Sequence, residues 1–293
     1  MDSKLFSDSV LVVGSSSKIG SYLADLLTLK CIPVWLTTKR LAKLDHRSLF
    51  LDLAQPVSTW QIPNQVFETS VICAAITSQK LCEQDYCGTY QVNVTSTVEL
   101  ARRLVDAGSF VIFISTNLVF DGTFPLVPAD YPVNPQTAYG QQKAEAELAI
   151  LALNPDSVAV VRLSKVLDPG FPLFQSWIDA LKVGSPIYPF LDLYMTPVSL
   201  QFAANVLIRV IQPHSSGIIQ ASAINDLSYA DVAYRLAEKL HLDTRLIHPV
   251  SCQTAGIVNA PRYTSLATDR LQNLGIYPPD AEQVINQLLV SIL

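Results

Sequence analysis

Tyr139 and Lys143 are the two side chains whose types and spacing could perform acid–base chemistry. They lie four positions apart in the run Tyr-Gly-Gln-Gln-Lys, and in a helix this spacing places the phenol and the ammonium on one face. Because a nearby positive charge favours a phenolate, we expect the pKa of Tyr139 to lie below the usual tyrosine value of about 10. Such a tyrosine could protonate a carbonyl oxygen while a hydride arrives at the carbon.

Two hydroxyl residues follow an upstream apolar run. Phe110–Ser115 is typical of a buried strand, and Thr116 comes directly after it. We expect the Thr116 hydroxyl to donate a hydrogen bond to the same carbonyl oxygen, with Ser115 beside it as support or substitute. A lone Tyr-x-x-x-Lys occurs on many exposed helices, so the combination with this strand end favours a catalytic interpretation.

A glycine-rich turn links the first apolar run, Val10–Val13, to a helical pattern. Gly14 and Gly20 occupy the outer positions of a Gly-x-x-Gly-x-x-Gly turn, and Ser17 stands at the middle position. Such turns let backbone N–H groups at a helix N-terminus approach a pyrophosphate, although a plain strand-to-helix turn is the alternative. The predicted dinucleotide-binding residues of this turn are Gly14, Ser16, Ser17, Lys18, Ile19 and Gly20.

The end of the next predicted strand, Ile32–Leu36, indicates which dinucleotide is bound. No acidic residue lies between Cys31 and Lys43, where an acid would bind the ribose hydroxyls of a cofactor without a 2′-phosphate. Cationic donors occupy this region instead, and Arg can bind phosphate through its planar fork. A solvated basic loop is the alternative. The sequence therefore predicts NADP(H), bound here by Thr38, Lys39 and Arg40.

Two further segments, a short apolar run before Asp52 and a predicted strand before Ala74, could contact the nucleotide. Asp52 could accept a hydrogen bond from the adenine amino group, with Leu53 beside it, although Asp also favours local caps. Ala74 and Ala75 follow another predicted strand, Val71–Cys73, and are small enough to lie next to a nucleotide.

The alternation of apolar runs and helical patterns predicts the fold. Short runs rich in β-branched residues are separated by segments of helical periodicity, such as 19–29, 91–105 and 141–153. This pattern is typical of an α/β, Rossmann-type, doubly wound parallel sheet. We expect an NADP(H)-binding domain at 1–165 and a smaller, mainly C-terminal substrate lobe at 166–293, in which a stretch punctuated by Pro and Gly (168–197) precedes helices near 200–211, 229–240 and 281–292. Part of the chain, about 196–222, should return to the first domain.

Composition excludes several classes of partner. The net charge is −5 and no basic run occurs, which argues against nucleic acid. The apolar runs are shorter than the roughly 18 residues of a membrane span, and residues 1–8 lack the pattern of a secretory signal, so we expect a cytoplasmic protein. The five cysteines and four histidines show no metal-ligand spacing. Only 15% of residues are charged, against about 25% on average, which suggests a homodimer.

Several of these segments resemble the extended short-chain dehydrogenases, and among them the dTDP-4-dehydrorhamnose reductase branch. Residues 115–122 resemble the strand end of that branch, and residues 135–143 resemble its active-site helix. Further resemblance covers 162–164, 196–198 and 261–266. The resemblance implies an NADPH-dependent reductase of a keto group on a nucleotide-linked sugar, with Thr116, Tyr139 and Lys143 as the catalytic set. It also implies that Lys143 binds the nicotinamide ribose.

Three positions depart from the pattern of the branch. Ser17 replaces a glycine, Asn117 stands where Asp is frequent, and Lys165 stands where an aromatic residue is frequent. We expect Asn117, Lys165 and Arg262 to bind the substrate, so the identity of the sugar stays open. The alternatives are an epimerase of the same fold and a catalytically silent NADP-binding regulatory subunit. A dehydratase is disfavoured because Asn117-Leu118 offers no carboxylate.

Overall fold

The computed structural model describes residues 9–60, 67–257 and 261–290, which form two compact units. The first unit comprises the described residues of Met1–Phe120, Val133–Arg162 and Gln201–Ile219. The second comprises those of Asp121–Pro132, Leu163–Leu200 and Gln220–Leu293. Residues 1–8, used above to argue against a secretory signal, and positions 291–292 of the predicted last helix lie outside the described residues.

A seven-stranded sheet forms the centre of the first unit. Its strand order is β10-β6-β5-β4-β1-β2-β3, and the pairs from β3 to β5 are parallel. The order reverses between β1 and β4, and ligands of such sheets bind beyond the carboxyl ends of the strands at this point. The predicted doubly wound α/β fold is confirmed. The strands are β1 Val10–Val13, β2 Val34–Thr38, β3 Ser48–Phe50, β4 Thr69–Ile72, β5 Phe110–Thr116, β6 Val158–Leu163 and β10 Gly217–Ala221.

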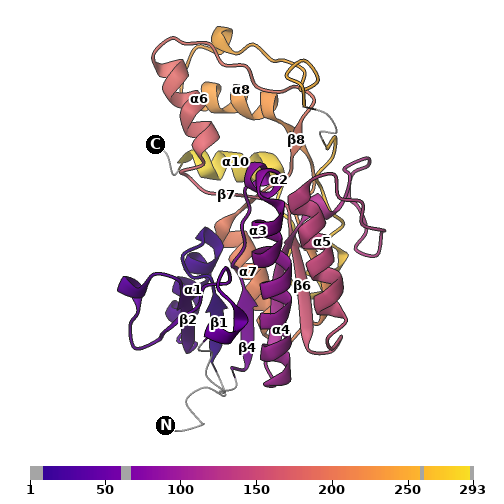
Figure 1. The fold of residues 1–293 in the computed structure, drawn as a ribbon. Helices are drawn as coiled ribbons and strands as arrows, with labels where there is room; N and C mark the ends of the chain where they lie inside the picture. The colour runs from indigo at the N-terminus through magenta and orange to yellow at the C-terminus, as the bar shows by residue number, and fades with distance from the viewer. Residues whose placement is uncertain (1–8, 61–66, 258–260, 291–293) are drawn as a thin grey trace. The chain divides into compact units, whose positions relative to one another are not determined.

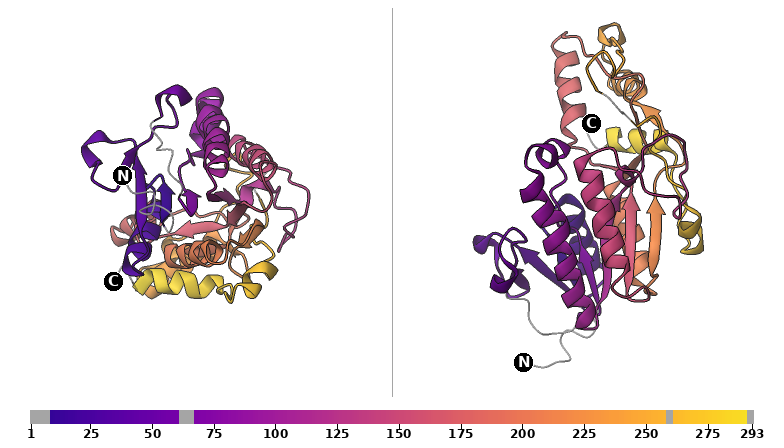
Figure 2. Two further views of the ribbon diagram at one scale, coloured as in Figure 1. Left: turned by 90° about the horizontal axis from the view of Figure 1, so that it is seen from below. Right: turned by 45° about the vertical axis from the view of Figure 1, so that its right-hand side comes forward.

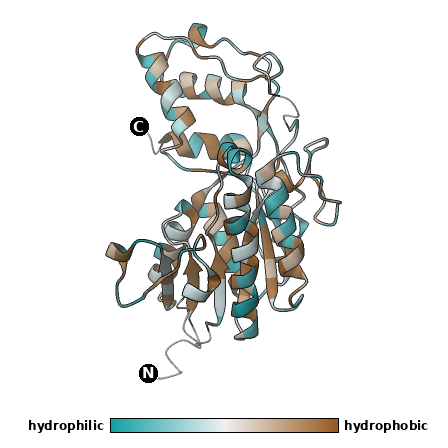
Figure 3. Ribbon diagram, in the orientation of Figure 1, coloured by the Kyte–Doolittle hydropathy of each residue, from teal (hydrophilic) through white to brown (hydrophobic). Residues whose placement is uncertain are grey.

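Helices cover both faces of this sheet. Helix α4 packs beside α5, and both contact β5 (Figure 1). Helix α7 lies against the other face (Figure 2). Figure 3 shows apolar strands between the helices, while α4 turns a polar side outward and buries Leu100, Ala101 and Leu104. The helices are α1 Lys18–Leu29, α2 Gln79–Gln84, α3 Tyr86–Tyr90, α4 Thr97–Asp106, α5 Ala138–Leu151 and α7 Leu200–Ile211, with short 3-10 turns η2 Leu41–Lys43, η3 Val57–Thr59 and η5 Asn117–Val119.

The helix predicted over 91–105 differs from a regular helix. Its first part, η4 (Gln91–Ser96), is π-helical and continues into α4 without a break. The Thr97 hydroxyl donates to the Val92 carbonyl oxygen at 2.8 Å, which closes the wider turn. Strand β3 and helix α2 were not predicted, because both are short and lack a clear apolar period.

The second unit has its own apolar core between helices. Phe174, Trp177, Leu236 and Ile285 are buried in it. Helix α6 lies in the stretch that we described only as punctuated by Pro and Gly; Pro172 opens this helix, as is usual at a first helical position. The elements are α6 Pro172–Lys182, α8 Tyr229–Lys239, α9 Asp269–Asn273, α10 Ala281–Val290, η6 Thr244–Leu246, β7 Lys165–Leu167, β8 Tyr194–Met195, β9 Pro197–Ser199 and β11 Leu227–Ser228. In neither unit does a described helix have the length and apolarity needed to cross a membrane.

A buried ion pair joins helix α5 to strand β6. The Arg162 Nε atom lies 3.1 Å from both carboxylate oxygens of Glu147, and the Nη2 atom lies 2.8 Å from Oε2. Both side chains are 3% exposed. The guanidinium carbon also lies 4.9 Å from the centre of the Phe120 ring. Each charge therefore depends on the other for compensation inside the unit.

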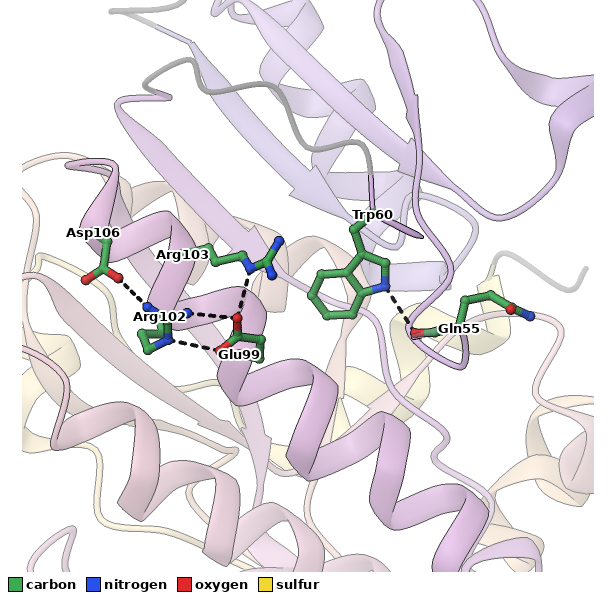
Figure 4. A network of polar contacts seen from close by, with 6 residues as sticks. All are labelled: Gln55, Trp60, Glu99, Arg102, Arg103 and Asp106. Carbon is green, nitrogen blue, oxygen red and sulfur yellow. Dashed lines mark hydrogen bonds and ion pairs between the residues drawn. The ribbon is translucent and has the colours of Figure 1, made fainter. Parts of the chain in front are cut away.

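Replacement of Glu147 by Ala should lower the free energy of unfolding by about 3–5 kcal/mol, because Arg162 would keep a buried charge without its carboxylate. Urea denaturation measures this loss. The matched control is Glu99→Ala on the surface of α4, where Glu99 pairs with Arg102 and Arg103 (Figure 4). Exposed pairs contribute about 1 kcal/mol or less. Equal losses in the two variants would contradict the importance of burial.

Candidate active site

The start of helix α5 is fixed by two side chains that accept hydrogen bonds from its first turn. The Thr137 hydroxyl oxygen accepts from the Gly140 N–H at 3.0 Å. The Glu83 carboxylate, from helix α2, accepts from the Ala138 N–H at 2.8 Å. Both bonds satisfy N–H groups that have no partner within the helix. They hold Tyr139, the second residue of α5, at a defined position.

Gly140 lets α5 approach the segment that follows strand β5. A Cβ atom at this position would overlap the carbonyl oxygen of Leu118. Tyr139 lies in the apolar cluster formed at this approach, with Cys82 and Ala138, and is 8% exposed. The phenol is therefore largely withdrawn from water.

Burial raises the pKa of Tyr139 above its usual value, and the nearby Cys82 acts in the same direction. Our expectation that Lys143 would lower this pKa is wrong. The spacing of four residues does place both groups on α5, but loss of hydration around the phenol outweighs any favourable charge. Tyr139 is consequently protonated throughout the neutral pH range.

Lys143 lies in the interior at the end of strand β5. Its side chain is buried, with the Nζ atom donating to the Ile114 carbonyl oxygen at 2.6 Å and lying 3.6 Å from the centre of the Phe113 ring. Burial lowers the pKa of Lys143 to about 7, while Glu147 and Cys73 act to raise it. The amine thus changes its charge near neutral pH.

The hydroxyl residues Ser115 and Thr116 follow Ile114 directly. The Ser115 Oγ atom is buried and has no hydrogen-bond partner among the described residues. The Thr116 Oγ1 atom accepts from the Leu118 N–H at 3.2 Å and donates to Asn117 Oδ1 at 3.5 Å. An unpartnered buried hydroxyl costs stability, so Ser115 is an exception to the usual pairing of buried polar groups.

A network of buried polar side chains holds α5 in place. The sequence analysis assigned no role to these side chains. Asn93, in the π-helical turn, donates to Gln142 Oε1 at 2.8 Å and accepts from the Ile76 N–H at 2.7 Å. Gln142 in turn donates to the Thr89 hydroxyl at 2.9 Å. The network joins α5, α3 and the segment after β4, and π-helical turns are frequent at functional sites.

One feature of the sequence could have indicated these supports. Tyr139, Lys143 and Glu147 recur every four residues, which places three ionisable groups on one line along α5, with Gln142 next to them. Charged residues are seldom fully buried unless they are paired. The line therefore indicates that buried polar partners exist, although it does not identify Arg162 and Asn93 as those partners.

The glycine-rich turn requires glycine at its first position. Gly14 has φ +83°, and a Cβ atom added to it would lie 2.8 Å from Ala74, so only glycine allows this approach. Ser17 is the N-cap of α1, with its hydroxyl oxygen accepting from the Gly20 N–H at 3.0 Å. This cap explains how serine can replace the middle glycine. Beside the turn, Ser16 and Lys18 are exposed and Ile19 is partly exposed.

The remaining nucleotide candidates lie at neighbouring strand ends. Thr38 ends β2, and its hydroxyl oxygen accepts from the Arg40 N–H at 3.1 Å, while Lys39 and Arg40 are exposed. Asp52 accepts from the Ala54 N–H at 3.1 Å, which is the local cap that we gave as the alternative to adenine binding. Leu53 is buried, and Ala75 is partly buried. The binding roles of all these residues stay predictions.

The predicted substrate residues fall in both units. Asn117 is partly buried in the first unit, next to Thr116. Lys165 begins strand β7 of the second unit. Arg262, also in the second unit, is exposed, with its guanidinium carbon 5.5 Å from the centre of the Tyr263 ring. Within the described parts of the chain, no group of three His, Cys, Asp or Glu residues could hold a metal ion.

Comparison with known proteins identifies relatives of this chain. The dTDP-4-keto-6-deoxy-D-glucose reductase of Streptomyces niveus is 26% identical over 275 residues, 92% of each chain. The methionine adenosyltransferase 2 subunit beta of Xenopus tropicalis is 26% identical over 224 residues, 72% of this chain and 67% of that protein. A dTDP-4-dehydrorhamnose reductase structure from Bacillus anthracis, in complex with NADP, shares the fold, with a TM-score of 0.82, 19% identity, and coverage of 98% and 100%.

The model of the RmlD substrate binding domain matches residues 8–292, almost the whole chain. The resemblance inferred from the motifs around Thr116 and Tyr139 is thereby confirmed. The chain belongs to the RmlD substrate binding domain family, whose relatives named above include dTDP-sugar reductases.

Proposed function

We propose that this protein is an NADPH-dependent reductase that transfers hydride to a keto group of a nucleotide-linked sugar. The observation that carries the proposal is the contact between Lys143 Nζ and the Ile114 carbonyl oxygen, 2.6 Å long. It brings the amine on α5 to the strand end that bears Ser115 and Thr116, on the same helix as Tyr139. The phenol of Tyr139, the amine of Lys143 and the hydroxyl groups of Ser115 and Thr116 are therefore brought toward the end of strand β5.

Tyr139 is the proton donor in this proposal. Its raised pKa keeps the phenol protonated, so a proton is available for a carbonyl oxygen that gains negative charge. Thr116 donates a hydrogen bond to that oxygen, with Ser115 beside it as support or substitute. Protonated Lys143 stabilises the phenolate that remains after transfer.

The cofactor binds across the strand ends near Gly14. The close approach of Gly14 to Ala74 and the N-terminus of α1 fit a pyrophosphate, and Lys39 with Arg40 fits a 2′-phosphate. When bound, NADPH supplies the hydride. Lys143 also binds the nicotinamide ribose, in keeping with the family resemblance.

The substrate is a nucleotide-linked sugar, and Asn117, Lys165 and Arg262 are each candidates to contact it. The names of the Streptomyces niveus and Bacillus anthracis relatives, both reductases of dTDP-linked compounds, support this class of substrate. We further propose that the reaction belongs to carbohydrate biosynthesis in the cytoplasm and that the protein is a homodimer.

A second candidate is a regulatory subunit that binds NADP without turnover. The similarity to methionine adenosyltransferase 2 subunit beta favours it. The presence of Thr116, Tyr139 and Lys143 disfavours it, because binding alone does not require a proton donor. An epimerase of the same fold would use the same residues but would leave no net oxidation of cofactor.

Replacement of Tyr139 by Phe should lower turnover by about 10²–10⁴-fold, the usual contribution of a general acid, while cofactor affinity is retained. The measurement is NADPH oxidation at 340 nm with a panel of nucleotide-linked 4-keto sugars, with cofactor titration alongside. Near-normal turnover in Tyr139→Phe would remove the mechanism. A wild type that binds NADPH tightly but turns over no panel member would support the regulatory subunit, and sugar inversion without net NADPH loss would support the epimerase.

The stability of the protein should rise with pH between about 7 and 9 because of Lys143. The pKa of this amine is about 7 in the folded chain and near its ordinary 10.5 when unfolded, so the unfolded chain binds more protons in this interval. The contribution is at most about 1.4 kcal/mol per pH unit, and Lys143→Met should abolish it. Urea denaturation from pH 6 to 9 measures the slope.

The exposed Lys182 provides the control, since Lys182→Met should leave this slope unchanged. The series ends at pH 9 because of Cys73. Burial raises the pKa of this thiol from 9.0 to about 12, so above pH 9 the unfolded chain loses the thiol proton before the folded chain does, and stability falls. A slope that survives in Lys143→Met would show that another group titrates there.

Cofactor choice should depend on the two cations after β2. Arg40→Ala and Lys39→Ala should each weaken NADPH binding by about 1.5–3 kcal/mol, the usual contribution of a charged hydrogen bond, and leave NADH binding almost unchanged. Fluorescence titration of both cofactors measures this selectivity. If the double variant keeps the preference for NADPH, the 2′-phosphate lies elsewhere.

A further inference from the structure

Lys165 has a fixed backbone in the second unit. It is the first residue of strand β7, which pairs in parallel with β9, so that Lys165 lies opposite Pro197. The Lys165 N–H donates to the Thr196 carbonyl oxygen at 3.2 Å. The side chain therefore starts from a defined position, which is a condition for a preorganised binding group.

The ammonium group of Lys165 has no counter-ion in the part of the chain that the structure describes. No hydrogen-bond acceptor lies within reach of its Nζ atom there, and its neighbour is the Phe171 ring, with its centre 5.0 Å away. Burial lowers the pKa of Lys165, and no carboxylate acts to raise it. An ammonium group that is drawn partly out of water without an anion destabilises the fold.

The Lys165 N–H is bonded to Thr196, and the Thr196 hydroxyl in turn donates to Asp226. The Asp226 carboxylate is already occupied by hydrogen-bond donors other than Lys165. Asp226 accepts from the Thr196 hydroxyl, the Thr264 N–H and the Ser265 hydroxyl, each at 2.6 Å. These bonds hold the segments around β9 and residue 264 together. Asp226 thus stabilises the surroundings of Lys165 without neutralising it.

Ser164, the residue before Lys165, carries a second unsatisfied polar group. Its side chain is 5% exposed, and the Oγ atom has no hydrogen-bond partner among the described residues. Buried hydroxyl groups are nearly always bonded in native proteins. Two adjacent residues therefore present donors that the chain itself does not use.

We propose that Lys165, assisted by Ser164, binds an anionic oxygen of the substrate. An ammonium group has three donors and no acceptor, and its bonds to phosphate or carboxylate are about twice as strong as bonds between neutral groups. The inference rests on the proposed function, since it assumes a nucleotide-linked sugar. The anionic oxygen belongs to the diphosphate of the nucleotide or to a carboxylate on the sugar.

The two sources can be separated with ligands that carry no keto group and so need no turnover. The ligands are dTDP, dTDP-glucose and dTDP-glucuronic acid, and the last two differ in a single carboxylate. Isothermal titration of the NADP-loaded protein would compare wild type with Lys165→Met, Ser164→Ala and the control Lys182→Met, which removes an exposed lysine of the same unit.

Lys165→Met should weaken binding by about tenfold to a hundredfold, as expected for a lost charged hydrogen bond. A loss for all three ligands assigns the diphosphate, and a loss confined to dTDP-glucuronic acid assigns the sugar carboxylate. Ser164→Ala should produce a smaller loss in the same ligands, and Lys182→Met should produce none. Unchanged affinities in Lys165→Met, or a wild type that binds none of the ligands, would overturn the proposal.

Thermal unfolding provides a second readout. Removal of an uncompensated cation should leave the melting temperature of Lys165→Met unchanged or raise it. A lower melting temperature with unchanged affinities would instead assign Lys165 a packing role against Phe171 and overturn the proposal. A wild type without reductase activity in which Lys165→Met still weakens ligand binding would refute the reductase and retain the anion site.

Discussion

The site depends on holding the Lys143 amine inside the first unit, away from water. Its hydrogen bond to the Ile114 carbonyl and the Phe113 ring next to it replace only part of the lost hydration, so its pKa falls to about 7. Glu147, one turn further along α5, opposes this fall. Glu147 is itself buried and needs Arg162 on β6 as its partner. A chain of charges thus extends from the sheet to the candidate proton donor.

Burial acts on the two groups of the acid–base pair in opposite directions. It keeps Tyr139 protonated by raising its pKa, and it favours loss of the proton from Lys143. A reduction consumes the phenol proton, so the first effect suits the reaction that we propose. Because burial favours the neutral amine, protonated Lys143 lowers the stability of the folded chain. Stability lost in this way at a functional site is a common compromise in enzymes.

The sequence predicts those features that follow from local pattern. Strand β1 and helix α7 have the predicted bounds, and the turn at Gly14 was identified from its glycines. The direction of the Tyr139 pKa shift could not be predicted, because it depends mainly on burial of the phenol and secondly on Cys82, and only the fold brings these surroundings close. The Asn93 network was missed for the same reason, since its members are distant in the sequence.

Membership of the family indicates the class of reaction more clearly than it indicates the substrate. The polar line on helix α5 violates the usual apolar pattern of an inward helix face, and such violations mark the places where function constrains the fold. In the proposed mechanism those residues act on a carbonyl group and the cofactor, whatever sugar carries the carbonyl. Lys165 is different, because it lies in the second unit and departs from the aromatic residue frequent in the branch. A shared fold does not fix specificity. An ammonium on β7 without a counter-ion among the described residues should reject ligands that leave it unpaired and favour those that bring a negative charge, so we expect this departure to influence the choice of substrate.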